Sequence, residues 1–182
     1  DRLSGKKILH IATHGEFVAG KPEDSYLLLG TGEKLAIPQI KDLVSFGLND
    51  VHLVVLSACE TALGGADAEG LEISGISAYF LEGGAKAAIA SLWQVNDAST
   101  SLLMEKFYHQ LSHNTVESPI TKAAALRNAQ LSFLQGNNQS PTSNKSRASV
   151  SLEIKPAVQV NQGSRFSHPY YWAPFILIGN GL

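Results

Sequence analysis

The chain has 182 residues, 44% of them hydrophobic, and a formal net charge of -2. This length suits one domain with a substantial core, and the near-neutral charge gives no indication of nucleic acid or an anionic membrane as a partner. No apolar run approaches the ~20 residues that span a bilayer, and no secretory signal peptide is recognisable. The single cysteine cannot form an internal disulfide, which is typical of a cytoplasmic protein.

The first part of the sequence contains a strand, a loop, a hairpin and a helix. Residues 7–13 are almost continuously apolar or small, which predicts a central strand buried on both faces. Residues 16–25 are rich in Gly, Pro and charge and are expected to form a loop. A short hairpin is predicted over residues 26–37. Pro38 then suits the first turn of a helix over residues 39–46.

The middle of the sequence repeats the alternation of strand and helix. Residues 51–57 form a second buried strand, and the small and acidic residues 60–69 are expected to be a loop. Residues 71–82 predict a mostly apolar helix that ends at a pair of glycines. Residues 86–93 predict a third buried strand.

The last part of the sequence is more varied. Two amphipathic helices are predicted over residues 99–111 and 120–134. Residues 135–151 are dominated by Asn, Gln, Ser, Thr and Lys, and they predict a mobile surface insert. Residues 151–160 have a weak strand-like alternation, and residues 175–179 predict a final apolar strand.

Strands that alternate with helices imply parallel strands joined by right-handed crossovers. The predicted fold class is therefore α/β, an open, mainly parallel sheet with helices on both faces. In such a sheet the active site lies at the carboxyl ends of the strands. A buried parallel strand so close to Asp1 needs neighbours on both sides. We therefore expect the sequence to be a fragment whose preceding part supplies further sheet.

Two of the predicted strands lead to chemically reactive side chains, His14 and Cys59. If these strands are neighbours, about 4.8 Å apart, both side chains reach one substrate carbonyl. Gly15 would let a backbone N–H group approach the same ligand. Two plainer interpretations stay open, because Cys59 also fits a small core residue and His14 also fits a loop histidine. His10, inside the first strand, is interpreted as structural.

Asp97 follows the third predicted strand and has two interpretations. It fits the N-cap of the next helix, and it also fits a carboxylate that receives a basic substrate side chain. Trp93 is interpreted as a packing residue. No metal site is expected from one cysteine and scattered histidines. No cofactor is expected either, because the glycines match neither a phosphate loop nor a dinucleotide-binding motif.

Several short segments together resemble the CHAT domain, a caspase-like peptidase domain often joined to tetratricopeptide repeats in bacteria. The resemblance covers nearly the whole chain and leaves only the insert after Gln135 unconstrained. The matching segments are Ile11-Ala12-Thr13-His14-Gly15, Leu56-Ser57-Ala58-Cys59-Glu60-Thr61, Glu69-Gly70, Ala90-Ser91-Leu92-Trp93-Gln94-Val95 and His168-Pro169-Tyr170-Tyr171-Trp172-Ala173-Pro174-Phe175.

The resemblance implies a caspase-hemoglobinase fold for residues 1–182, as a single domain that lacks the first one or two strands of the family. It also implies a cysteine endopeptidase with His14 and Cys59 as the catalytic dyad. The backbone N–H groups of Gly15 and Cys59 would form the oxyanion hole.

The segment after the third strand also looks like that of separases, which prefer arginine before the cleaved bond. By that similarity Asp97 would line the first specificity pocket. Trp93 and Glu60 are expected as further substrate-binding residues. The expected partners are protein or peptide substrates and an N-terminal or tetratricopeptide-repeat regulatory region, with no nucleic acid and no membrane.

Two other classes of function are weighed against a peptidase. A catalytically silent caspase-like interaction module would have no need of both His14 and Cys59. A hydrolase of another class with a cysteine nucleophile would be expected to carry a Gly-x-Ser/Cys-x-Gly elbow, which the sequence lacks.

Overall fold

The computed structural model divides the chain into two compact units, Asp1–Val95 with Pro174–Gly181 and Asn96–Ala173 with Leu182. Organisation of residues 1–182 as a single domain stays a prediction. The residues that the structure describes are 7–18, 21, 23–44, 47–57, 60–61, 71–135 and 166–182.

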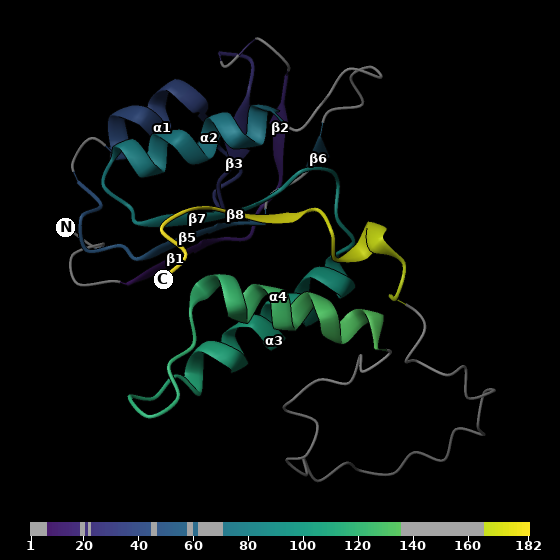
Figure 1. Ribbon diagram of the computed structural model, residues 1–182. Helices are drawn as coiled ribbons and strands as arrows, with labels where there is room; N and C mark the ends of the chain where they lie inside the picture. The colour runs from purple at the N-terminus through teal and green to yellow at the C-terminus, as the bar shows by residue number, and fades with distance from the viewer. Residues whose placement is uncertain are drawn as a thin grey trace, which may run out of the picture. The chain divides into compact units, whose positions relative to one another are not determined.

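The first unit is built on a four-stranded sheet in the order β1-β5-β7-β8. The strands β1 (Ile8–Ile11), β5 (Leu53–Leu56) and β7 (Ala87–Ser91) are parallel. β8 (Phe175–Gly179) runs antiparallel to β7. The predicted α/β class with a mainly parallel sheet is confirmed (Figure 1).

The antiparallel direction of β8 follows from where the strand begins. The Leu92 N–H group donates a hydrogen bond to the Pro174 carbonyl, 3.0 Å away, and Ser91 pairs with Phe175. The chain therefore starts β8 beside the carboxyl end of β7 and runs back along it.

One face of this sheet carries the hydrophobic core of the unit. The helices α1 (Ile37–Val44) and α2 (Leu71–Glu82) lie over it side by side (Figure 1). The opposite face of β5 and β7 is also buried, so the prediction of two buried strands is confirmed. The core cluster contains Val54, Leu56, Ala88 and Ala90 from the sheet and Ile37, Ile40, Ile76 and Phe80 from the helices.

The prediction of a central strand over residues 7–13, buried on both faces, is wrong for the sheet that the structure describes. β1 lies at one end of the strand order and pairs with β5 alone within the described residues. Its side chains alternate between exposed and half-buried, and Ile8 is 43% exposed. An apolar run indicates that a strand is suited to burial, but it does not fix how many strands flank it.

A second sheet in the first unit has the order β4-β3-β2-β6. β3 (Tyr26–Leu28) and β4 (Lys34–Ala36) form the predicted hairpin. β2 (Gly15–Phe17) pairs antiparallel with β3 and parallel with β6 (Glu60–Thr61).

The loops predicted over residues 16–25 and 60–69 therefore begin as strands β2 and β6. These strands comprise three and two residues, and such short segments carry no readable alternation. They form because pairing partners from elsewhere in the chain supply their hydrogen bonds. Tertiary context has overridden the local loop signals of Gly and charge.

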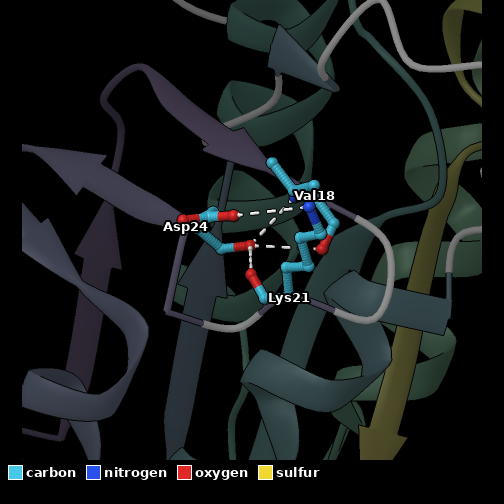
Figure 2. A network of polar contacts seen from close by, with 4 residues as sticks. Val18, Lys21 and Asp24 are labelled. Atoms are coloured by element: carbon cyan, nitrogen blue, oxygen red, sulfur yellow. Dashed lines mark hydrogen bonds and ion pairs between the residues drawn. The ribbon is translucent and has the colours of Figure 1, made fainter.

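In the connection from β2 to β3, polar groups around Val18, Lys21 and Asp24 contact one another (Figure 2). The Val18 N–H group donates to Ser25 Oγ at 2.9 Å, and the Ser25 hydroxyl donates to the Lys21 carbonyl at 3.0 Å. Lys21 Nζ also lies 3.9 Å from Asp24 Oδ2, which forms an ion pair. Both side chains are exposed, so this ion pair contributes little to stability.

The second unit contains the helices α3 (Asp97–Ser112) and α4 (Lys122–Leu134), which pack against each other. Both predicted helices are confirmed, with shifted ends. The caps are Asn96 and Thr121, whose side chains accept the N–H groups of Ser99 and Ala124. Asp97 is therefore the first helical residue and not the N-cap.

The aromatic segment that begins at His168 contains a short 3₁₀ helix, Pro169–Tyr171. The Trp172 indole N–H group donates to the Ser167 carbonyl at 3.1 Å, and the Gln130 side chain on α4 donates to the Trp172 carbonyl at 3.1 Å. The first bond lies within the segment, and the second ties it to α4 within the second unit.

Most of the insert predicted over residues 135–151, and the strand suggested over residues 151–160, lie outside the described residues. Gln135 is described and caps the end of α4. Among the described helices, none combines the length and the apolar character that crossing a membrane requires.

We predict that Gly179→Ala destabilises the first unit by about 2 kcal/mol or more, because two effects add there. Gly179 has a φ of +92°, and an added Cβ would lie 2.8 Å from the Lys86 carbonyl oxygen and 3.2 Å from Ala87 Cα. Gly32→Ala is the matched control, because its φ is +85° with nothing within 4 Å of an added Cβ. The control should lose about 1 kcal/mol from backbone strain alone. Equal losses in urea unfolding would contradict this account.

Candidate active site

The two sheets bracket the segments that contain His14 and Cys59. β1 pairs with β5 in parallel up to Ile11 and Leu56, and β2 pairs with β6 in parallel from Glu16 and Glu60 onward. Residues 12–15 on one chain segment and residues 57–59 on the other connect these pairings. Cys59 itself lies outside the described residues.

The segment around His14 is held by the backbone of Leu28 on β3. The Leu28 N–H group donates to the His14 carbonyl at 2.7 Å, and the Thr13 hydroxyl donates to the Leu28 carbonyl at 2.5 Å. The His14 side chain is exposed, whereas Gly15, the first residue of β2, is buried. The sheet thus fixes the main chain at His14 while the imidazole stays accessible.

The segment that leads to Cys59 is held by β1. The Ser57 N–H group donates to the Ile11 carbonyl at 3.1 Å, which continues the ladder one step beyond β5. The Ser57 hydroxyl lies 3.0 Å from His10 Nε2 and is hydrogen-bonded to it. His10 keeps exposed surface, but desolvation of its ring lowers the pKa of the imidazole and so favours the neutral form.

The structure brings some of the predicted site residues together and assigns others to separate parts of the chain. The backbone of Glu60 pairs with Glu16, which follows Gly15 in β2. The predicted substrate-binding residue Glu60 therefore lies beside the segment that contains His14. Trp93 follows β7 and is half-buried, and it takes part in interactions of its own. Asp97 is exposed in the first turn of α3, in the second unit.

Two residues at these strand ends were not singled out by the sequence. Thr13 and Ser57 each use a hydroxyl group to bind a neighbouring strand. A signal for both is present, because each is a small polar residue next to the end of an apolar run. Only the strand register identifies their partners. Within the described residues, no group of three or more His, Cys, Asp or Glu side chains is placed to hold a metal ion.

Comparison with known proteins identifies one matching family. The sequence model of the CHAT domain family matches residues 2–180 of the chain. Over 140 residues, 76% of this chain, the sequence is 31% identical to a mouse (Mus musculus) protein named tetratricopeptide repeat protein 28. The matched segment makes up 4% of that protein, so the chain spans only a small part of its length.

We predict that Thr13→Val weakens the attachment of the His14 segment, because valine keeps the shape of threonine and removes the hydroxyl donor. The loss of this hydrogen bond should lower the free energy of unfolding by about 1 kcal/mol. The Leu28 amide, which binds the His14 carbonyl, should exchange its hydrogen faster in NMR measurements. Thr13→Ser is the control, because it keeps the hydroxyl and should retain most of the protection. Equal exchange rates in the Val and Ser variants would contradict the role of the hydroxyl.

Proposed function

Because the chain belongs to the CHAT domain family, which is related to caspase-like peptidases, we propose that it is a cysteine endopeptidase. In this proposal Cys59 and His14 hydrolyse peptide bonds in protein substrates. Gly15 and Cys59 supply the backbone N–H groups of the oxyanion hole.

The observation that carries the proposal is the pairing on both sides of the two segments. Ile11 pairs with Leu56 before them, and Glu16 pairs with Glu60 after them. Parallel neighbours are about 4.8 Å apart, so the described ends of the two segments lie side by side. We infer that this arrangement brings the Cys59 thiol and the His14 imidazole within reach of one substrate carbonyl.

The reaction that this pair would perform has two stages. His14 accepts the thiol proton of Cys59, and the thiolate forms a bond to the carbonyl carbon of the substrate. The carbon–nitrogen bond then breaks while His14 donates the proton to the departing amine. A water molecule next attacks the thioester and passes a proton to His14. The carbon–sulfur bond breaks, the new carboxyl group leaves, and the proton returns to the Cys59 thiol.

The residue before the cleaved bond is the finer part of the proposal. We propose that Asp97 favours substrates with arginine or lysine at this position, with Trp93 and Glu60 as further substrate-binding residues. Helix capping had been the competing role for Asp97, and Asn96 performs it instead. The Asp97 carboxylate is exposed, so it is available to a basic side chain.

Regulation by an attached region is a further part of the proposal. The mouse relative is a tetratricopeptide repeat protein by name, and this chain matches 4% of it. We propose that a tetratricopeptide-repeat or other N-terminal region gates access of protein substrates to Cys59 and His14. The lone cysteine is compatible with a reducing compartment such as the cytoplasm, where we place the activity.

We predict that Cys59→Ala abolishes peptide cleavage and that His14→Ala lowers kcat by about 10²-fold or more, because the variant lacks the general base. The measurement is cleavage of a denatured protein mixture, followed by mass spectrometry of new termini, with the full-length protein. His52→Ala is the matched control, because His52 is also exposed and lies just before β5. Unchanged cleavage by the Cys59→Ala variant would refute the peptidase, and a folded wild-type protein without activity would favour an interaction module.

We predict that the wild-type protein prefers Arg or Lys before the cleaved bond and that Asp97→Asn removes the preference. The loss in kcat/KM for basic substrates should be about tenfold or more, as expected for a hydrogen bond to a charged group. Asp50→Asn is the control, because Asp50 is another exposed aspartate, in the turn before β5. A peptide panel with different residues at this position measures the effect. A wild-type protein without a basic preference would contradict the role of Asp97.

A further inference from the structure

We propose that the hydrogen bond between His10 and Ser57 is a positioning contact for catalysis. It fixes, relative to each other, the two strand ends that lead to His14 and Cys59. The inference rests on the proposed function and deepens it, because it assigns a role to two residues outside the His14–Cys59 pair.

The contact joins the two strands that matter most for the site. His10 is in β1, four residues before His14 in the sequence, and Ser57 follows β5, two residues before Cys59. His10 Nε2 and Ser57 Oγ are 3.0 Å apart. The register pairs His10 with Val55, so the bond runs diagonally forward to the next residue on the same face of β5. It connects side chains on the face opposite the Val54 and Leu56 core.

The position of the bond gives it a role that the backbone ladder cannot fill. The β1–β5 pairing ends at Ile11 and Leu56, and the Ser57 N–H bond to the Ile11 carbonyl adds one backbone contact beyond it. A single backbone bond leaves the torsions of Ser57 free to vary. A second bond from its side chain to His10 restricts them, and these torsions set the direction in which the chain continues to Cys59. A displacement of about 1 Å is enough to slow an enzyme about 10²-fold.

The chemistry of the two side chains suits this task. Desolvation lowers the pKa of His10 and favours the neutral imidazole, which presents one donor and one acceptor nitrogen. The Ser57 hydroxyl also donates and accepts, so the pair stays bonded with either imidazole tautomer. In this proposal His10 orients Ser57 through their hydrogen bond, and it does not touch the substrate.

The test uses variants of Ser57 in the full-length protein, since Ser57 is the smaller of the two side chains. We expect Ser57→Ala to lower kcat about tenfold while KM stays within about twofold, because misplaced reacting groups slow the chemical step and leave binding intact. Ser57→Thr keeps the hydroxyl and should restore most of the rate. His10→Phe should lower kcat similarly, and the double variant should be no slower than either single one, because both lose the same contact.

A second measurement keeps this inference separate from the peptidase proposal. Cys59 is the only cysteine, so alkylation by iodoacetamide reports its reactivity without any substrate. We expect Ser57→Ala to change the alkylation rate several-fold, as His14→Ala does, because thiolate formation depends on the pairing of the two groups. If the folded wild-type protein cleaves nothing, the function fails, and the alkylation rates still decide the role of Ser57.

Three results would overturn the positioning role. The first is a Ser57→Ala variant whose kcat and alkylation rate both stay within about twofold of wild type. The second is additive losses in the double variant, which would mean that the two residues act independently. The third is a rate loss that matches the unfolded fraction measured by circular dichroism, since a purely structural bond lowers activity only by unfolding the protein.

Discussion

The parallel pairing of β1 with β5 is the constraint on which the rest of the first unit depends. β5 is buried on both faces, and a slip by one residue would move every side chain to the opposite face, so its register is specified by how its side chains pack on each face. Both strands then continue into the second sheet, where β2 and β6 pair again in parallel. The segments with His14 and Cys59 are thus short connections between two fixed pairings. A rigid scaffold beneath exposed connecting segments is the usual way in which a fold presents reactive groups.

Side-chain hydroxyl groups appear where the backbone ladders stop. Thr13 binds the Leu28 carbonyl, and Ser57 binds His10, at the last residues before the ladder is interrupted. A connection that must leave the sheet loses its main-chain partners, and its geometry would otherwise be set by flexible torsions. Short polar side chains restore part of that constraint without adding bulk. This is the support that a catalytic pair needs from its surroundings.

At the start of α3 in the second unit, the neighbouring residues Asn96 and Asp97 have different roles. Asn96 and Asp97 are both good helix-capping residues, and the sequence pattern supported a cap at Asp97 while leaving a binding function open. The structure gives the cap to Asn96, whose side chain accepts the Ser99 N–H group. Asp97 then lies in the first helical turn, where a carboxylate also interacts favourably with the helix dipole. Its exposed charge is compatible with binding a cation, which the capping role would have opposed.

The α/β class, the hairpin, the strands β5, β7 and β8 and the helices α1 to α4 could all be predicted from the sequence, because buried runs, helical periodicity and glycine stops are local signals. The prediction of α2 over residues 71–82 matches the structure at both ends. The sequence also indicated His14 and Cys59, since each follows an apolar run, and the catalytic role of both residues stays a prediction. Three features came from the tertiary structure: within the described residues β1 pairs with β5 alone, β2 and β6 form strands, and Thr13 and Ser57 bind neighbouring strands. These features depend on which distant segments become neighbours and in what register, and no local pattern of residues contains that information.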